Sequence, residues 1–553
     1  MTRFQFLEMG FGLAFLVAAL RTAWWQTVKS GDLASAAKAE RTQDVTLPYR
    51  RGAIYDRNGV VLAQSISVVT ISTDPTMVKS DQVEKIAQAI KQRFGGSLDE
   101  YREELTRANT RNVTLVEAAD PDIAADLESL GYAGLYYTDG YQRVYPLNEV
   151  ACSVIGCINN DGDAASGLEL QYDSILSGTD GSRTRELGIT GGVIVGGEDE
   201  YVAPVDGLDV RISIDVDMQR TAQEALADTV EQWGCDSGCA VALDPATGEI
   251  LLCASTPTFD PNHLERLTDS DALGLKPITS AYEPGSVLKP LTMAAAINEG
   301  LTTADTEYWV PTSIQVGSDT VKDAEARAEA TSMTPTNMLE HSSNIGTVMI
   351  ADMLGAKKFS EYFDAFGIGS STGVDFPYED TPHVKSYSEY DGAWESMAFG
   401  QSVSVSPLQV ARAIGAIANE GLRTDPHFLV AVGDQDVTYA DGTRVLTTAT
   451  AESVCWMMNS VVTNGYGYTG AIEGYNVAAK TGTGERYDAT TGTYSTDHYV
   501  VSFVGFAPTE APAAVLYVLF DNVDETHELL TAGSPWATIM QRVLTKLNVA
   551  PSA

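Results

Sequence analysis

The chain has 553 residues, of which 44% are hydrophobic and 20% are charged. These proportions are ordinary for a globular protein, and the length suits two or three domains. The 75 acidic residues outnumber the 35 basic ones and give a net charge of −40, so the basic footprint of a nucleic-acid-binding protein is missing and we expect no nucleic-acid partner. The same charge repels anionic lipid headgroups, so any membrane link has to be hydrophobic.

Residues 4–24 are predominantly apolar, and the run from Met9 to Leu20 is unbroken. The segment is near the lower limit of length for crossing a bilayer, about 17 residues. Trp24 and Trp25 follow the run, and aromatic residues often mark the membrane interface. We therefore expect a transmembrane anchor over residues 4–24. A cleaved signal peptide is the alternative, and both place the rest of the chain outside the cytoplasm.

The polar residues 25–44 predict a connector between this segment and the first domain. Residues 45–205 predict a mixed α+β domain without catalytic motifs. Within it, Asn58-Gly59 between β-prone runs predicts a tight hairpin turn. Residues 81–131 carry helical patterning with many charges.

Residues 206–547 predict a second, larger domain, and residues 548–553 a short tail. A strand pattern at Asp209–Asp215 is followed by a helix pattern at Met218–Trp233. Beyond it, helices and strands mix without regular βαβ alternation. This mixture predicts an α/β domain with a mainly antiparallel sheet and helices packed on it.

The six cysteines are too few for a disulfide scaffold in a chain of this length. Cys235 and Cys239 have no second pair at metal-ligand spacing, so no zinc site is expected. A symmetric hairpin around residues 244–248 would place Cys239 opposite Cys253. The alternative is two free thiols packed as small apolar residues.

Ser286 begins an apolar helix pattern that ends at Gly300, and Lys289 shares its helix face at i+3. A serine hydroxyl is a weak nucleophile and needs a base nearby. Lysine serves as that base only when burial or a second cation lowers its pKa. The start of a helix also offers backbone N–H groups to a developing oxyanion. The pair predicts an activated serine, with a helix N-cap as the alternative for Ser286.

Ser342 and Asn344 lie two residues apart, between two helical patterns. A hydroxyl and an amide on such a loop can relay a proton and hold a substrate amide. A helix N-cap is again the alternative.

Lys480-Thr481-Gly482 follows a short apolar run and predicts the end of a strand, with residues 499–506 as an antiparallel neighbour. Lys480 would supply a cation and Thr481 a hydroxyl for a carboxylate. Gly482 would leave room for a close backbone approach. The alternative is an exposed strand end without a site.

The order Ser-x-x-Lys, Ser-x-Asn, Lys-Thr-Gly within one predicted domain resembles that of penicillin-binding proteins and serine β-lactamases. The match extends over most of the chain and is closest to class B penicillin-binding proteins, the monofunctional peptidoglycan D,D-transpeptidases of division and elongation. The segments that resemble this family are Arg51–Gly59, Arg143–Pro146, Gly167–Glu169, Asp244–Glu249, Tyr282–Ser286 and Gly400–Gln409. The resemblance implies a serine β-lactamase-like transpeptidase domain after a pedestal domain and a transmembrane helix.

The resemblance also implies a role for each motif residue. Ser286 would attack the D-Ala-D-Ala bond of a stem peptide, with Lys289 as the base. Ser342 would pass the proton to the leaving amine, and Asn344 would hold the substrate amide.

The third motif would bind the end of the substrate. Lys480 and Thr481 would stabilise the terminal carboxylate, beside Gly482. The backbone N–H groups of Ser286 and Thr483 would form the oxyanion hole. No metal or organic cofactor is implied.

The resemblance further implies that β-lactams trap Ser286. The implied protein partners are a polytopic glycosyltransferase of the shape-and-division type and other division or elongation proteins. The implied location is the bacterial cell membrane, with the catalytic domain outside the cytoplasm. Two rival functions use the same serine: a D,D-carboxypeptidase or β-lactamase that sends water to the acyl-enzyme, and a non-catalytic β-lactam sensor or division scaffold.

Overall fold

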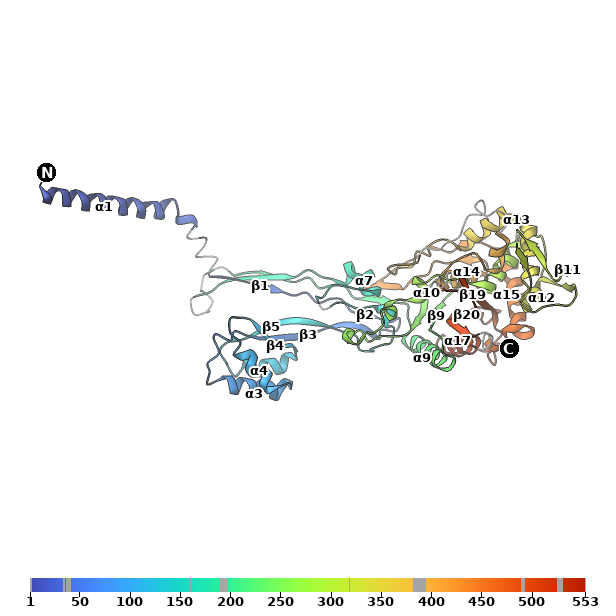
Figure 1. The fold of residues 1–553 in the computed structure, drawn as a ribbon, viewed down its shortest axis with the longest axis horizontal. Coiled ribbons are helices and arrows are strands. Elements are labelled where there is room, and N and C mark those ends of the chain that lie inside the picture. Colours follow the sequence, from blue (N-terminus) through green and yellow to red (C-terminus); the bar gives the residue numbers. More distant parts are fainter. Residues whose placement is uncertain are drawn as a thin grey trace. The chain divides into compact units, whose positions relative to one another are not determined.

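The structure is a computed structural model. It describes residues 2–32, 35, 41–159, 161–188, 194, 197, 199–317, 319–380, 394–488, 493–524 and 531–552. These residues form two compact units whose segments alternate along the chain (Figure 1). The first unit comprises Met1–Gly52, Ser65–Gln142 and Ser177–Gly207, and the second comprises Ala53–Gln64, Arg143–Leu176 and Leu208–Ala553. The domain boundaries expected from the sequence run in simple chain order and stay predictions.

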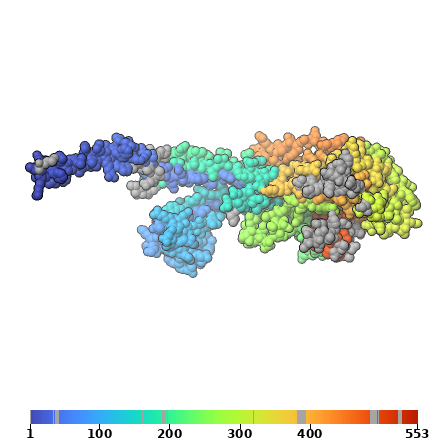
Figure 2. Space-filling model, turned by 45° about the horizontal axis from the view of Figure 1, so that its top comes forward, coloured from blue at the N-terminus to red at the C-terminus, as the bar shows by residue number. Residues whose placement is uncertain are grey.

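Helix α1 (Arg3–Thr27) begins the first unit. A capping box between Thr2 and Gln5 satisfies the free N–H groups at its start. Every residue of α1 is exposed; the helix lies in the blue part of the surface in Figure 2. Within the described part of the chain, it is the one helix long and apolar enough to cross a membrane. An exposed apolar helix of this length fits a single-pass membrane anchor.

A small core in the first unit joins three helices to three strands. Its elements are β3 (Val61–Thr73), α3 (Val83–Phe94), α4 (Leu98–Leu105), β4 (Val113–Ala119), α5 (Pro121–Glu128) and β5 (Leu135–Val144). The helices bury Ile86, Leu105 and Leu127 against Ile71 of β3. The helical patterning expected in this part of the chain is therefore confirmed, with β4 as an intervening strand.

A second sheet in the first unit is antiparallel and has the order β1-β6-β7. Its strands are β1 (Thr42–Leu47), β6 (Gly181–Glu186) and β7 (Asp199–Val202). Most of their side chains are exposed or half-buried, so this sheet contributes little to a hydrophobic core.

The second unit is built on a five-stranded antiparallel sheet with the order β10-β9-β21-β20-β19 (Figure 1). Its strands are β9 (Ser237–Leu243), β10 (Ile250–Thr256), β19 (Ala478–Asp488), β20 (Thr493–Ala507) and β21 (Ala514–Asp524). The antiparallel sheet expected from the sequence is confirmed. Strand β19 lies at an edge of the sheet and carries the Lys-Thr-Gly motif.

Helices cover both faces of this sheet because alternate strand residues point to opposite sides. On β9, Val241 packs into one core and Ala240 into the other. The core that contains Ala240 also contains α9 (Val216–Trp233) and α17 (Gly533–Lys546). The opposite core is formed by α11 (Lys289–Asn298), α13 (Asn344–Phe366), α14 (Pro407–Ala418) and α15 (Thr448–Asn464).

Short elements connect these parts. The strands are β2 (Ile54–Tyr55), β8 (Val210–Ile212), β11 (Tyr308–Val310), β12 (Ile314–Val316), β13 (Asp319–Val321), β14 (Thr331–Met333), β15 (Leu422–Arg423), β16 (Leu429–Val432), β17 (Gln435–Asp436) and β18 (Thr443–Arg444). The short α-helices are α6 (Cys152–Ile155), α7 (Gly167–Gln171), α8 (Asp173–Leu176), α10 (Lys276–Thr279) and α12 (Pro335–Glu340). The 3-10 turns are η1 (Leu264–Arg266), η2 (Ser270–Leu273), η3 (Gly285–Leu288), η5 (Trp394–Phe399) and η6 (Tyr466–Gly470).

The hairpin expected at Asn58-Gly59 is confirmed. β2 pairs antiparallel with the start of β3, and Gly59 has a φ of 84° in the turn. Glycine adopts this left-handed conformation without the steric cost that other residues carry.

The placement of Cys239 opposite Cys253 is wrong. The turn is already asymmetric by one residue, since Ile250 pairs with Leu243, and a bulge in β10 between Ile250 and Leu252 shifts the register by a second residue. Cys239 therefore pairs with Ser255 and Cys253 with Val241. The bulge adds one residue to one strand of the hairpin, which a symmetric count around the turn could not include. All six cysteines are free and buried, as the alternative of packed thiols predicts.

A buried ion pair links two motifs of the second unit. Arg143 Nε donates to Glu169 Oε1 at 2.7 Å, and the two side chains are 2% and 0% exposed. The Tyr145 hydroxyl donates to the same carboxylate at 3.3 Å. A charge with so little access to water needs such a partner to be tolerated.

Candidate functional site

Ser286 lies in the 3-10 turn η3, and the α-helix α11 begins at Lys289. Pro290 stands in the first turn of α11, where its missing N–H costs nothing. The helix expected to start at Ser286 therefore starts one turn later, although the expected burial of its body is confirmed. Ser286 itself is half-buried, so its hydroxyl lies at the edge of the core and within reach of solvent.

The Lys289 side chain is fully buried and points at the Ser-x-Asn motif. Its Nζ donates to Asn344 Oδ1 at 2.7 Å and to Ser342 Oγ at 3.1 Å. It also donates to the Ser342 carbonyl oxygen. Within the described part of the chain, no hydrogen bond to the Ser286 hydroxyl is present, so that oxygen is available to a substrate.

Lys480 approaches the same hydroxyl from strand β19. Its Nζ lies 3.0 Å from Ser342 Oγ and also donates to the Thr481 carbonyl and hydroxyl oxygens at 3.0 and 3.3 Å. Lys480 is 0% exposed. The three motifs, far apart in sequence, therefore meet at the Ser342 side chain.

Burial changes the proton affinity of both lysines, because a low-dielectric interior disfavours the charged ammonium form. It lowers the pKa of Lys289 well below its usual range, and the nearby charge of Lys480 lowers it further, while Asp323 acts in the opposite direction. Burial also lowers the pKa of Lys480 to about 7. Lys289 therefore has the lowered pKa that a lysine needs to act as a base.

The loop that carries Ser342 joins α12 to α13, as expected from the two flanking helical patterns. Ser342 has a φ of 51°, a left-handed conformation that is uncommon for a residue with a Cβ. Ser343 caps α13 by accepting from the Gly346 N–H at 3.0 Å. The predicted alternative of an N-cap thus applies to Ser343, which leaves the side chains of Ser342 and Asn344 free to meet Lys289.

Asp323 contacts this loop, although it belongs to none of the three sequence motifs. Its carboxylate accepts from Ser343 Oγ at 3.0 and 3.1 Å and from the Ile345 N–H at 3.0 Å. It belongs to a segment after β13 that contains no motif, so only its spatial position identifies it.

Glycines allow β19 to lie directly against the nucleophile turn. A Cβ on Gly482 would stand 2.5 Å from Ser502 Oγ, 2.8 Å from Val287 Cγ1 and 3.0 Å from the Pro284 carbonyl oxygen. Gly285 has a φ of 60°, and a Cβ there would stand 2.5 Å from the Thr483 carbonyl oxygen. The close approach expected at Gly482 is therefore observed, and it brings Thr483 beside the turn that holds Ser286.

Strand β19 (Ala478–Asp488) carries its motif near its start and continues beyond it, so the motif does not end the strand. Lys480 pairs with Val504 and Gly482 with Ser502 of β20, which confirms the expected antiparallel neighbour. Thr481 is half-buried and Thr483 is exposed. Among the described residues, no group of three or more His, Cys, Asp or Glu side chains has the arrangement of a metal site.

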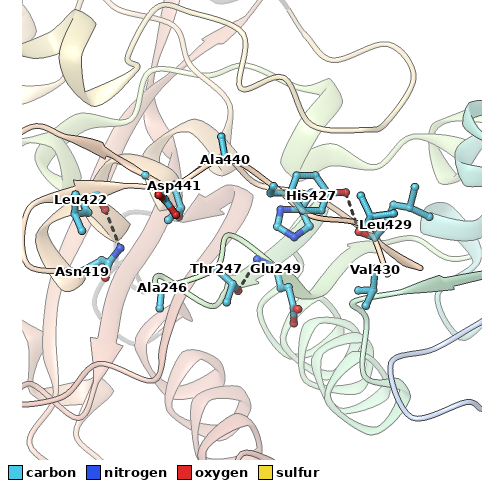
Figure 3. Close-up of a pocket in the computed structure, with 14 residues that line it drawn as sticks. Ala246, Thr247, Glu249, Asn419, Leu422, His427, Leu429, Val430, Ala440 and Asp441 are labelled. Carbon is cyan, nitrogen blue, oxygen red and sulfur yellow. Dashed lines mark hydrogen bonds between the residues drawn. The ribbon is translucent and has the colours of Figure 1, made fainter. Parts of the chain in front are cut away.

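A separate pocket of about 610 Å³ lies in the second unit (Figure 3). His427 and Tyr439 stack in it at 3.5 Å between ring centroids, with Glu249 and Asp441 among its other lining residues. None of the eight motif residues predicted from the sequence lines this pocket. The residues predicted to be catalytic therefore lie apart from this pocket.

Two family models and several known proteins match the chain. Residues 238–544 match the penicillin-binding protein transpeptidase domain, and residues 46–212 match the penicillin-binding protein dimerisation domain. Penicillin-binding protein PbpB of Mycolicibacterium smegmatis is 32% identical over 547 residues, which cover 92% of this chain and 84% of that protein. Peptidoglycan D,D-transpeptidase FtsI of Escherichia coli is 29% identical over 565 residues, which cover 98% and 91%.

A solved structure gives the same result. Penicillin-binding protein 3 of Mycobacterium tuberculosis, in complex with aztreonam, superposes with a TM-score of 0.72 at 27% identity, over 92% of this chain and 98% of that one. The matched domains, the relatives and the buried pair of lysines at a Ser-x-Asn loop agree with one another. The chain belongs to the penicillin-binding protein transpeptidase family and is a class B penicillin-binding protein.

Proposed function

We propose that this serine-type transpeptidase cross-links peptidoglycan through an acyl-enzyme on Ser286. The observation that carries the proposal is the convergence of two buried lysines on the Ser342 hydroxyl. One of them, Lys289, lies three residues after Ser286. The substrate class follows from the relatives, among them the peptidoglycan D,D-transpeptidase FtsI. β-Lactams are the expected inhibitors, because the structure of penicillin-binding protein 3 of Mycobacterium tuberculosis was solved in complex with the β-lactam aztreonam.

In the first step, Ser286 Oγ attacks the carbonyl carbon of the penultimate D-Ala, and its proton passes to the neutral amine of Lys289. The backbone N–H groups of Ser286 and Thr483 hold the oxyanion that forms. The close contact between Gly285 and Thr483 supports this assignment, because it places Thr483 beside the turn that carries Ser286.

In the second step, the C–N bond of the terminal D-Ala breaks, and Ser342 passes a proton to the leaving amine. Ser342 Oγ is suited to this relay because it contacts both Lys289 and Lys480. Asn344 holds the substrate amide. An amine of a second stem peptide then attacks the ester carbonyl, which forms the cross-link and returns the proton to the site.

Lys480 and Thr481 bind the terminal carboxylate of the donor peptide in this proposal. A bound carboxylate beside the Lys480 ammonium group favours its charged form, which burial alone disfavours. The Thr481 hydroxyl, half-buried next to it, supplies a second donor.

Labelling with a fluorescent penicillin tests the nucleophile. We expect one adduct per chain, found by peptide mass mapping on Ser286 and absent from Ser286→Ala. An adduct on any other residue overturns the assignment. Incubation of the acyl-enzyme with an added amine acceptor tests transfer against hydrolysis, since a D,D-carboxypeptidase or β-lactamase would release only the hydrolysed product at every acceptor concentration.

The catalytic domain is proposed to lie outside the cytoplasm of a bacterial cell, anchored by α1. Since all six cysteines are buried, a cysteine placed at Asp436, whose side chain is 79% exposed, would be the only accessible thiol. A membrane-impermeant maleimide added to intact spheroplasts should label this variant. Labelling only after lysis would place the domain in the cytoplasm and overturn the proposal.

A polytopic glycosyltransferase of the shape-and-division type is the proposed membrane partner, with other division or elongation proteins. Its test is detergent co-purification of the tagged full chain. The matched control replaces residues 4–24 with an unrelated apolar span, since a partner recognised through α1 should be lost from that control.

A further inference from the structure

The segment after β13 is tied to the Ser-x-Asn loop at several points. The Lys322 carbonyl oxygen accepts from Asn344 Nδ2 at 3.1 Å. Asp323 receives three hydrogen bonds from Ser343 and Ile345. Since Asn344 Oδ1 also accepts from Lys289, the Asn344 side chain is held at both ends of its amide.

Asp323 is in turn held from behind. Arg327 Nη2 donates to Asp323 Oδ2 at 2.8 Å, and their side chains are 18% and 9% exposed. The same guanidinium donates to the carbonyl oxygens of Val310 and Pro311 at 3.2 and 2.8 Å. A continuous chain of contacts therefore runs from the end of β11 through Arg327 and Asp323 to the start of α13.

The Asp323 carboxylate lies at the N-terminus of α13, where a negative charge is favourable. It accepts from the Ile345 N–H in the first turn of α13, where a helix presents free N–H groups and a partial positive charge. The loop it holds is strained, since Ser342 has a φ of 51°. A left-handed conformation of this kind is unfavourable for a residue with a Cβ and persists only where surrounding contacts enforce it.

We propose that Asp323 is a positioning residue for acylation: it holds the strained Ser342–Asn344 loop so that the Ser342 hydroxyl stays between Lys289 and Lys480. This inference rests on the proposed relay role of Ser342. Asp323 does not touch the reacting atoms, and it acts through Ser343 and Ile345.

Asp323 also places a negative charge near Lys289. The charged groups that act on Lys289 are Lys480 from β19, which lowers its pKa, and Asp323, which raises it. Removal of the Asp323 charge therefore lowers the pKa of Lys289 further, and the ascending limb of the acylation profile should move to lower pH. A residue that only stabilised the fold would not move this limb.

The experiment compares the rate constant of acylation by a fluorescent penicillin for four variants across a pH series. In Asp323→Asn, one acceptor oxygen remains and the charge is lost. Acylation at the optimum should fall about 10- to 100-fold, the effect of a misplacement of about 1 Å, and the ascending limb should shift to lower pH. In Ser343→Ala, one tie is lost but the charge remains, so the rate should fall without a shift of this limb.

Glu325→Gln is the matched control on the same segment. Glu325 accepts from the Tyr466 hydroxyl rather than from the Ser-x-Asn loop, so both rate and profile should match the wild type. An Asp323→Asn enzyme with wild-type rate and profile overturns the proposal. Thermal unfolding shows whether each variant folds. If Asp323→Asn does not fold, Arg327→Met replaces it, because this substitution removes the contact that holds Asp323 but keeps the carboxylate. A wild-type acylation rate for folded Arg327→Met also overturns the proposal.

Ser342→Ala in the same assay separates this inference from the proposed mechanism. If Ser342→Ala acylates normally, the relay role fails whatever Asp323 does. If Ser342→Ala is slow and Asp323→Asn is fast, only the inference about Asp323 fails.

Discussion

Lys289 and Lys480 direct their amino groups at one hydroxyl oxygen, Ser342 Oγ, at 3.1 and 3.0 Å. Both lysines are fully buried, and two ammonium groups so close together in a low-dielectric interior repel each other. The two lysines therefore favour a state in which only one of their amino groups is protonated. If Lys480 keeps the proton and donates to Ser342 Oγ, the Ser342 hydroxyl can donate its own proton to neutral Lys289, which prepares the relay.

Ser342→Ala should retain the fold and lose most of the acylation rate. The loss expected for removal of a proton relay is about 100- to 10,000-fold, measured with a fluorescent penicillin at fixed pH. Ser332→Ala on β14, whose hydroxyl donates to the surface residue Glu307, is the control and should acylate normally. If Ser342→Ala has only a small effect on the acylation rate, another group must carry the proton relay.

The acylation rate should have a bell-shaped dependence on pH. Lys289 is a base only when neutral, so the rate rises as pH increases through its lowered pKa. Lys480 attracts a substrate carboxylate only when protonated, so the rate falls as pH increases through about 7. The two limbs belong to a coupled pair and are read as apparent values.

Lys480→Arg separates the two limbs, because a guanidinium stays charged at all accessible pH values. The descending limb should disappear in this variant while the ascending limb stays. A descending limb that persists in Lys480→Arg would assign it to another group.

Gly482→Ala should slow acylation without unfolding the protein. The added Cβ meets Ser502 Oγ, Val287 and the Pro284 carbonyl oxygen, so β19 must move away from the turn that holds Ser286. We expect a rate lower by about 100-fold, as for a displacement of about 1 Å. Gly415→Ala is the matched control, because nothing lies within 4 Å of the added Cβ. Replacing a glycine inside a helix with alanine stabilises the helix by about 0.5–1 kcal/mol.

Glu169→Gln should destabilise the second unit strongly, because it leaves the buried Arg143 charge without its carboxylate. The expected loss in free energy of unfolding is about 3–5 kcal/mol, measured by urea denaturation. The exposed pair Arg102–Glu84 provides the control, since Glu84→Gln removes a solvent-exposed ion pair and should change the free energy of unfolding little. Equal effects of the two substitutions would show that the buried pair contributes no more than the exposed one.

The sequence by itself determined the apolar N-terminal helix, the antiparallel sheet and the three motifs, because each depends on local patterns. Apolar runs, alternation and turn residues such as Asn58-Gly59 act over a few positions, and the helices α3 and α9 formed where their periodicity predicted them. The motif order also identified the family, which the matched domains confirm.

Only the tertiary structure decided how the motifs act on one another. The lowered pKa of Lys289 depends on burial and on Lys480, which lies on strand β19, far along the chain from helix α11, and burial is a property of the packed core. The asymmetric turn and the bulge, which together separate Cys239 from Cys253 in the register, follow no signal in the turn sequence. Asp323 has no motif around it, and its role arises from contacts that form only when the segment after β13 folds over the start of α13. Such contacts join residues through space, so no periodicity along the chain could predict them.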